Sequence, residues 1–369
     1  MATNTFVTVD QLARDASLLS NDRLRVALAC SRSTEQEFAN KKGDVVKVQV
    51  PAVFSANEFT STTTEQAIAQ TSQSVTIEKH FEVTVPLTSK EKTLKLDDFN
   101  KQVTVPAVNA LVDKIEAYLL KKMHGLQLWS GTGGTAPSTI AHIVAGRKVL
   151  QDAKLAGPRF GLISTTTEAA LLQLAQFQSR DYAADNEMGV REGMLGKRFG
   201  IEWIVTPNSS GFDRGSIAGT IAVVANTAAG ATSIALDGFT AATGTVYAGT
   251  HFTIAGDTTV YVVTADATKA SNAATVSIYP PLAAAADADD LATIKAAATD
   301  DFLMVGGAMA AAILPPAPLA VGSAIYNAGG IGIRVSQSSS TSTLSDQIVF
   351  DVLCGAQAVH PYAGAVWQA

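Results

Sequence analysis

Five histidines are the first candidates for chemistry, because imidazole binds metals and exchanges protons near neutral pH. None of them lies three or four residues from another histidine or from a cysteine, which is the ligand spacing of common zinc sites. The spacing therefore favours surface or hydrogen-bonded core histidines over a metal centre. The five are His80, His124, His142, His251 and His360.

Glycine-rich and acidic segments offer two further kinds of site. Segment 130–135 is rich in glycine, but no lysine follows it as in a phosphate-binding P-loop, and no strand precedes it. The glycines of 329–332 open a strand pattern instead of a helix, so both segments are interpreted as connectors. Asp287, Asp289 and Asp290 lack the glycine and the terminal glutamate of an EF-hand loop, which favours a solvated acidic loop over a calcium site.

The chain also lacks the sequence patterns of common catalytic sites. It has no Gly-x-Ser-x-Gly elbow for a nucleophilic serine, and no pair of carboxylates stands out. We therefore expect a protein that is not an enzyme and that has no cofactor and no metal.

Charged side chains on two polar segments remain as candidates for contacts with other chains. One segment is a Thr/Ser-rich stretch with its flanking strands, where a charge either pairs with a neighbouring subunit or faces solvent. The other is a glycine-punctuated loop, whose charges could form rings around a local symmetry axis. The candidates are Lys47, Glu58, Glu65, Glu78 and Lys79 on the first segment and Arg180, Asp181, Arg191, Glu192, Lys197 and Arg198 on the second.

The composition limits the classes of protein that fit. The 369 residues are 47% hydrophobic, enough for a sizeable core in two or three domains. Only 16% are charged, against about a quarter in typical domains, so contacts with other subunits or a Thr/Ser/Gly-rich surface must replace charge. The net charge of −6 argues against a dedicated nucleic-acid binder, but it suits a container that encloses DNA without gripping it.

Compartment and membrane placement follow from a few local features. Cys30 and Cys354 lie far apart in apolar contexts, so buried free thiols fit better than a disulfide and indicate synthesis in a reducing compartment. The first residues lack the basic and apolar regions of a secretory signal. The longest apolar run, 305–322, contains three prolines that would break a membrane-spanning helix, so a buried strand and turn is expected there.

Residues 1–42 are expected to form an N-terminal arm, with helical patterns from Asp10 and over 24–38.

Residues 43–96 are predicted to form an extended loop built on a β-hairpin. Apolar residues alternate with polar ones over 44–54 and again over 75–85, with a slip at 79–80. The polar stretch 55–74 between them is far longer than a tight hairpin needs. A two-stranded ribbon is barely stable alone, so these strands are expected to find no complete cover in their own molecule and to pack on a neighbouring chain.

A long amphipathic helix is predicted within residues 97–137. Its apolar residues recur at spacings of three and four, lysines crowd its last turn, and Gly125 supplies the stop. With a lead-in from Asp97 the helix would exceed twenty residues. The stripe is Val108, Leu111, Val112, Ile115, Tyr118, Leu119 and Met123, and the exposed side carries Asp113, Lys114, Glu116, Lys121 and Lys122.

Residues 138–215 are predicted to form an axial α/β domain. A helix is expected over 138–155, and Thr165 and Glu168 have the spacing of a capping box ahead of another helix. Short buried strands are expected at 160–163 and 201–205.

The composition changes near residue 216, from which Ala, Thr, Gly, Val and Asp dominate as far as about 298. Short alternating runs at a spacing of about eight to twelve residues indicate a small sandwich or barrel, so 216–298 are predicted to be an inserted β-rich domain. Residues 299–369 are predicted to form strands that belong to the domains preceding the insertion. The expected strands are 221–224, 233–236, 252–254, 259–263 and 275–279 in the insertion and 303–305, 331–335 and 348–353 in the return.

Several short segments carry a family pattern. They are 43–48 followed by Pro51, 301–303 with 308–310 in an FxxxAxA arrangement, 331–335, 349–355, and His360 with Pro361. With the order of the parts, they resemble the HK97-like capsid fold of tailed bacteriophages, in the branch that carries an inserted β-barrel domain. The family's closing strands have an arginine, an aspartate and an aromatic residue before a glycine; here Cys354 stands in place of the aromatic.

The resemblance implies an α+β fold and a major capsid protein that self-assembles through hexamers and pentamers into an icosahedral phage head. The head would enclose double-stranded DNA, bound without sequence specificity. The protein would reside in the virion after assembly in the cytoplasm of a bacterial host, without a membrane. A portal protein is the implied partner, a decoration protein is compatible with it, and the lack of a long N-terminal coiled coil predicts a separate scaffolding protein.

Two alternatives belong to other classes of protein. A secreted β-rich adhesin or surface-layer protein would explain the Thr/Ala/Gly-rich stretch, but the missing signal and the long amphipathic helix speak against it. A small-molecule enzyme would need a polar constellation that the sequence does not offer.

Overall fold

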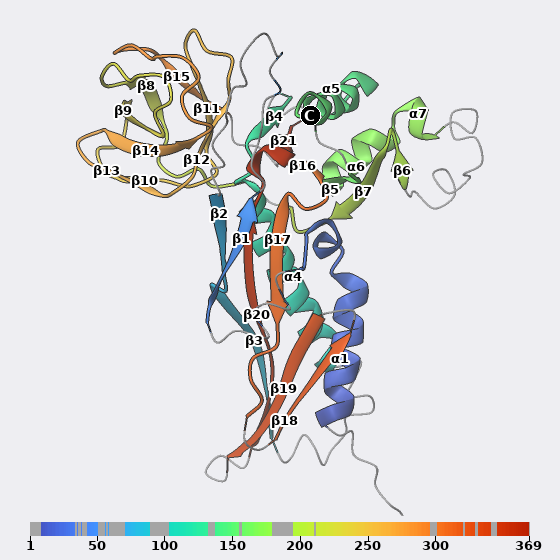
Figure 1. The fold of residues 1–369 in the computed structure, drawn as a ribbon. Coiled ribbons are helices and arrows are strands. Elements are labelled where there is room, and N and C mark those ends of the chain that lie inside the picture. Colours follow the sequence, from blue (N-terminus) through green and yellow to red (C-terminus); the bar gives the residue numbers. More distant parts are fainter. Residues whose placement is uncertain are drawn as a thin grey trace, which may run out of the picture.

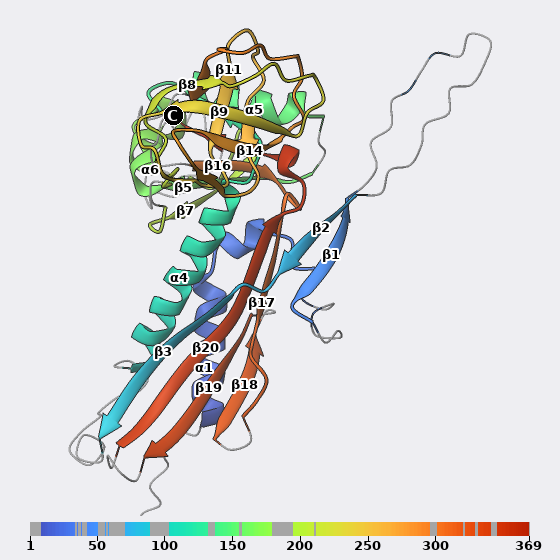
Figure 2. The same ribbon diagram turned by 90° about the vertical axis from the view of Figure 1, so that its left-hand side faces the viewer.

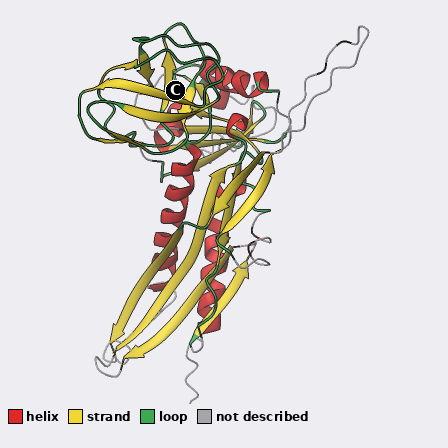
Figure 3. Ribbon diagram, turned by 60° about the vertical axis from the view of Figure 1, so that its left-hand side comes forward, coloured by secondary structure: helices red, strands yellow, loops and turns green. Residues whose placement is uncertain are grey.

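The body of the molecule is a long sheet with two helices along one face, joined at one end to an α/β layer and a β-rich unit (Figures 1 and 2). Strands predominate, and the two longest helices run beside the body sheet (Figure 3). The computed structural model describes residues 9–33, 35, 38, 43–50, 56, 58, 71–88, 103–131, 137–154, 157–178, 195–209, 212–295, 301–319, 322–328, 331–340 and 345–368.

The body sheet is organised around its longest strand, β20. One edge of β20 pairs with β3, and the other edge pairs first with β19 and then with β17, while β18 continues the sheet beyond β19. Alternate residues of β20 point to opposite faces, and Phe350, Val352 and Cys354 on one face are fully buried in the main core. The strands are β3 (Lys79–Thr88), β17 (Met309–Leu314), β18 (Ser323–Ala328), β19 (Ile331–Ser340) and β20 (Ser345–Ala358).

Helix α4 (Val105–Met123) packs on that buried face, and every residue of the predicted apolar stripe is buried. The helix ends two residues before Gly125, as the stop predicted. Its predicted lead-in from Asp97 falls outside the described residues. The placement of Glu116 on the exposed side is wrong: its side chain is buried, because position 116 lies on the same helical line as Val112 and Leu120.

The described part of the predicted arm folds against its own body. Helix α1 (Val9–Arg23) packs on β18 and β19 beside α4, with Ala13 and Ala16 fully buried. A hydrogen bond from Ser17 Oγ to the carbonyl of Tyr326 fixes this contact. The second helical pattern does not begin at Leu24 as predicted, because within 24–33 the chain forms only the short 3₁₀ helix η1 (Val26–Ala29). Farther along the pattern Glu35 and Phe38 are helical, and its other residues beyond 33 lie outside the described ones.

The predicted second hairpin strand is divided in two. Strand β1 (Val45–Val50) pairs antiparallel with β2 (Thr71–Thr76), and after a break at Ile77 and Glu78 the chain continues as β3 in the body sheet. The slip in the alternation therefore marks the point where the chain passes from the ribbon of β1 and β2 into the body sheet. The sequence predicted this slip at 79–80, two residues later than the observed break.

The α/β layer is a six-stranded sheet in the described part of the chain, ordered β4-β21-β16-β5-β7-β6. Helix α5 begins after Thr139, slightly later than predicted. Helix α6 begins slightly earlier, because its cap is Ser164 and not the predicted Thr165. Ser164 Oγ accepts the Thr167 N–H at 3.2 Å. The elements are β4 (Leu128–Ser130), α5 (Ile140–Asp152), β5 (Arg159–Ser164), α6 (Thr165–Leu172), α7 (Ala175–Gln178), β6 (Lys197–Arg198), β7 (Ile201–Thr206), β16 (Asp301–Val305), η3 (Pro361–Ala363) and β21 (Gly364–Trp367).

The apolar run 305–322 is divided between two sheets. Strand β16 ends at Val305 in the α/β layer, a turn follows at Gly306 and Gly307, and β17 then lies in the body sheet. Among the described residues, no helix is long and apolar enough to cross a membrane.

The β-rich unit between residues 212 and 295 has a core of its own, made by residues such as Ile234, Phe252 and Val276. Its main sheet has the order β15-β11-β12-β14-β9-β8, and β10 pairs with β13. That this unit is an inserted barrel domain with the limits 216–298 stays a prediction. The strands are β8 (Gly219–Val223), β9 (Ser233–Phe239), β10 (Gly244–Val246), β11 (His251–Ile254), β12 (Tyr261–Val263), β13 (Ala267–Lys269), β14 (Ala274–Tyr279) and β15 (Ala292–Ile294).

Candidate functional site

The ribbon of β1 and β2 has one covered face and one open face. Val46 and Val75 stand opposite each other in the register, and both are buried against Ala310 and Ala312 of β17. The described part of the ribbon therefore finds cover for one face in its own molecule, while the other face stays open, as the expectation of incomplete cover requires. Lys47 lies exposed on the other face, where another chain could reach it.

The passage from ribbon to body carries two of the predicted contact residues. The Glu78 carboxylate pairs with Lys122 Nζ of α4 at 2.9 Å and accepts the Tyr118 hydroxyl at 3.4 Å. Lys79, next to it, is exposed. Glu78 thus has partners within its own chain, and a contact of either residue with another subunit stays a prediction.

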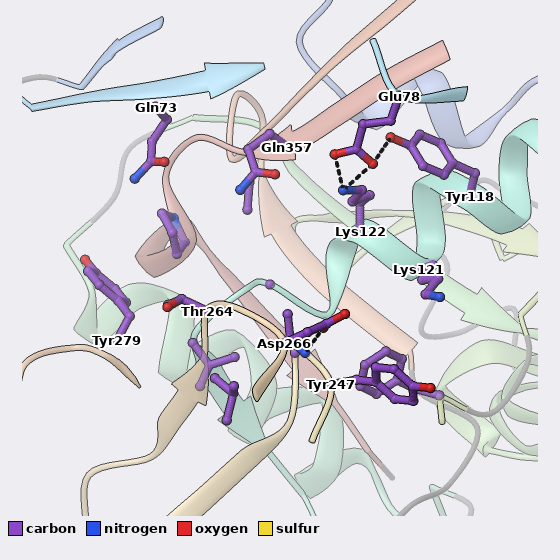
Figure 4. A pocket seen from close by; sticks show the side chains of 18 of the residues that line it. Gln73, Glu78, Tyr118, Lys121, Lys122, Tyr247, Thr264, Asp266, Tyr279 and Gln357 are labelled. Carbon is purple, nitrogen blue, oxygen red and sulfur yellow. Dashed lines mark hydrogen bonds and ion pairs between the residues drawn. The ribbon is translucent and has the colours of Figure 1, made fainter. Parts of the chain in front are cut away.

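A cavity of about 550 Å³ lies where the ribbon, the end of α4 and the β-rich unit meet (Figure 4). Figure 4 shows the Glu78, Tyr118 and Lys122 group on one side and Tyr247, Thr264 and Asp266 of the β-rich unit on the other. The charged side chains that line it are Glu78, Lys79, Lys121, Lys122 and Asp266.

The two carboxylates that line this cavity have hydrogen-bond partners within the chain. Glu78 is engaged by Lys122 and Tyr118, and Asp266 Oδ1 accepts the Ala248 N–H at 2.8 Å. Nucleophile and base pairs need a free acceptor beside a reactive donor, and these carboxylates already have partners. In the part of the chain that is described, no group of three or more His, Cys, Asp or Glu residues could hold a metal ion.

The second predicted contact segment is only partly within the described residues. Arg198 in β6 turns inward, donating to the Gln176 carbonyl at 2.8 Å and lying over the Phe177 ring at 5.5 Å, whereas Lys197 is exposed. Glu58 is exposed. Glu65, Arg180, Asp181, Arg191 and Glu192 fall outside the described residues.

Glu116 is a buried carboxylate that sequence reasoning missed. Its Oε2 accepts the Thr206 hydroxyl at 3.2 Å and the Asn208 amide at 2.9 Å, and its Oε1 faces the Val26 N–H at 3.5 Å. It therefore ties the arm, the long helix and the α/β layer together. The signal was its spacing of four from Val112, which put it in line with the apolar stripe.

A second missed group lies on the face of the body sheet that points away from the main core. The Asp351 carboxylate, 3% exposed, is bound by both Arg334 Nε at 2.9 Å and Arg334 Nη2, and it contacts His80 Nε2 at 3.0 Å. These residues come from β19, β20 and β3. The arginine and aspartate of the closing-strand pattern are thus joined as an ion pair across two strands.

Asp301 is the third buried carboxylate. It accepts the Ser164 N–H at 2.6 Å and the Thr167 hydroxyl, so it fixes the start of α6. Burial raises the pKa of Asp301 to about 6, against the opposing effect of the hydrogen bonds from Thr167 and Ser164. The sequence shows Asp301 only as the first residue of the FxxxAxA segment, without this role.

Comparison with solved structures identifies the fold. The chain is similar to a structure of Mycobacterium phage Che8, with a TM-score of 0.54 and 14% identity over 92% of this chain and 89% of that chain. The capsid structure of the cyanophage P-SCSP1u has a TM-score of 0.45, with 13% identity over 89% and 84%, and a virus-like particle from Pyrococcus furiosus has 0.46, with 10% identity over 97% and 98%.

The last two scores are too low to establish a common fold by themselves. No family model and no curated protein matches the chain. The similarity to the phage Che8 structure spans nearly the whole of both chains, and the order of arm, ribbon, long helix, α/β layer and closing strands is the one expected from the sequence. The chain thus has the predicted α+β fold and shares it with the phage Che8 structure.

Proposed function

We propose that this chain is the major capsid protein of a tailed bacteriophage, which assembles through hexamers and pentamers into an icosahedral head around double-stranded DNA. The observation that carries the proposal is the fold shared with a phage structure over almost the entire chain. The capsid-like motifs of the sequence, including the now paired Arg334 and Asp351, support it independently.

The proposed assembly uses several modest contacts per subunit. Shell subunits meet through unlike patches, and closure multiplies the effect of each weak contact while errors can still dissociate beforehand. The open face of the ribbon with Lys47, the exposed Lys79 and the exposed Lys197 of β6 are proposed as such patches. The covered root of the ribbon would hold it at a fixed angle to the body.

The finer divisions belong to the same proposal. We divide the chain into an arm (1–42), an extended loop (43–96), a spine helix (97–137), an axial domain (138–215), an inserted domain (216–298) and return strands (299–369). Separate scaffolding and portal proteins would be partners during assembly in the host cytoplasm, a decoration protein could be added later, and DNA would lie inside without sequence readout. The subunit would have a structural role and no catalytic one.

A secreted adhesin or surface-layer protein is the second candidate, and only the composition of the β-rich unit favours it. Size-exclusion chromatography and negative-stain microscopy of the purified chain separate the two, because a coat protein gives closed shells and a surface-layer protein gives sheets or fibres. Closed shells, alone or with a coexpressed scaffolding protein, are expected. A compact monomer at high concentration under both conditions would contradict the proposal.

A pair of charge reversals tests the ribbon. Lys47→Glu changes the exposed face of β1 and is expected to lower the yield of closed shells at least about tenfold, since like charges across a contact cost several kcal/mol. Lys148→Glu on α5, a lysine that is also exposed, is the control and should leave the yield within about twofold of the unchanged protein. Equal yields from both variants would remove the ribbon from the assembly contacts.

A further inference from the structure

Two buried histidines join the β-rich unit to the rest of the molecule. His124 follows the last residue of α4, and His251 is the first residue of β11. Both are almost or completely shielded from solvent, with 4% and 0% of their surface exposed. Neither belongs to the proposed contacts between subunits.

His251 holds the β-rich unit to the chain that leaves α4. Its Nε2 lies 2.7 Å from the carbonyl oxygen of Leu126. A carbonyl oxygen only accepts, so Nε2 carries the proton and the neutral ring has this tautomer. The centroid of the His251 ring also lies 5.3 Å from the centroid of the Trp129 ring in β4. The imidazole therefore contacts the body both through its Nε2 hydrogen bond and through an aromatic neighbour.

His124 provides the other half of the junction. Its ring stacks on Phe212 at 4.1 Å between centroids and meets Phe302 of β16 edge-on at 5.0 Å. The loop ahead of β11 lies close against it, since a Cβ on Gly249 would come within 2.7 Å of His124 Cβ. The imidazole therefore fills a tightly packed space between the two parts of the molecule.

The charged surroundings of this junction are mostly positive. Arg214 is buried with its guanidinium over the Phe212 ring at 5.6 Å, and Lys121 lies one turn back on α4. Lys295 follows β15, the strand beside β11, and its backbone N–H donates to the His251 carbonyl. Asp266 lines the neighbouring cavity, but it is exposed and accepts the Ala248 N–H.

These surroundings oppose protonation of both rings. Burial lowers the pKa of His251 to about 4, assisted by the positive charge of Arg214 and opposed by the hydrogen bond to Leu126. Burial also holds the pKa of His124 well below its usual value, and His251, Arg214 and Lys121 add to the effect. An imidazolium at either position would lie in a dry space beside a buried cation.

We propose that His124 and His251 form an acid-released latch that holds the β-rich unit on the end of α4 at neutral pH and frees it in acid. The cavity of about 550 Å³ provides the route, because Gly125, Phe212 and Gly249 line it and also flank the latch. Water entering there would solvate the protonated rings once the loop ahead of β11 moves away from α4.

The direction of the pH dependence follows from proton binding. The closed junction binds fewer protons than the open one between the ordinary histidine pKa of about 6.5 and the lowered value of about 4 for His251. The closed state is therefore fully favoured above pH 6.5 and loses stability as the pH falls toward 4. The opening is local, because the β-rich unit has a separate core.

Hydrogen exchange on the full chain tests the latch. Amide protection in 246–254, corrected for the intrinsic pH dependence of exchange, is expected to fall roughly tenfold or more between pH 7.5 and 4.5. Protection in β14 should change by less than about twofold, since its side chains lie in the separate core.

Two variants remove the titrating groups. His251→Gln keeps an N–H donor for the Leu126 carbonyl, and His124→Phe keeps an aromatic ring to stack on Phe212. The double variant should hold its pH 7.5 protection in 246–254 down to pH 4.5, and each single variant should retain part of it. If the double variant does not fold, the two single variants decide by the same measurement. Unchanged protection in the original chain at pH 4.5, or an equal loss in the variants, would overturn the proposal.

Discussion

The body sheet and the β-rich unit are both built from antiparallel strands, yet they reach stability by different means. The β-rich unit closes its core with strands and loops of 217–294 alone. The body sheet needs α1 and α4, which precede most of its strands in the chain, to cover one face. Its other face carries Arg334, Asp351 and His80. Local chain is enough for the first region, whereas the second depends on distant segments meeting.

Truncation of a buried phenylalanine in each region should separate them most clearly. Phe350→Ala in β20 is expected to cost about 3–5 kcal/mol of unfolding free energy and to remove exchange protection from α1, α4 and β3 together. Phe239→Ala in β9, the matched change, should lower protection only within the β-rich unit. Chemical denaturation measures the unfolding free energies, and hydrogen exchange measures the protection of each element. Loss of protection in α4 after Phe239→Ala would contradict the independence of the β-rich unit from the body sheet.

Removal of Asp351 tests what the Arg334–Asp351 pair, on the face of the body sheet away from the main core, contributes to stability. Asp351→Ala leaves the Arg334 guanidinium, 12% exposed, without its carboxylate, and should cost about 3 kcal/mol. Urea unfolding gives the value. The exposed pair of Lys148 and Asp152 supplies the control: Asp152→Ala should shift the urea midpoint hardly at all. Equal shifts would mean that the cross-strand pair is as weak as a surface pair.

Glu116 tests how the body is tied to its neighbouring layer. Glu116→Ala leaves the Thr206 hydroxyl and the Val26 N–H without this acceptor and is expected to cost about 2 kcal/mol, whereas Glu116→Gln keeps an acceptor and should cost less. Thermal unfolding of both variants measures the difference. A larger loss for the glutamine than for the alanine would contradict the role of Glu116 as an acceptor.

Asp301 and the histidine junction should respond to pH in opposite directions. Because the pKa of Asp301 is raised to about 6 from an ordinary 3.8, the folded α/β layer binds an extra proton between these values, and its stability falls as the pH rises through them. Asp301→Asn should flatten this slope by about 1 kcal/mol per pH unit near pH 5. Urea unfolding from pH 4 to 7 checks it; an unchanged slope would show that Asp301 ionises equally easily in both states.

The sequence predicted elements well where one periodicity ran without interruption. The stripe of α4 and the alternation in β9 and β14 correspond to buried positions. The prediction from sequence failed where the structure of a segment is determined by contacts with residues far away in the chain. The division between β2 and β3 depends on pairing with β20, and the burial of Glu116 depends on its hydrogen bonds with Thr206 and Asn208. The candidate contact residues remain open for the same reason, since their proposed partners belong to another copy.

The pairing of Val83 with Phe350 has a consequence for biosynthesis. The ribosome must synthesise all the residues between Val83 and Phe350, including the whole β-rich unit, before β20 can pair with β3. During that interval the side of α4 that β20 later covers is open to other apolar surfaces, so the nascent chain is expected to be a client of chaperones. The β-rich unit, whose strands lie near one another in the chain, can fold during the same wait.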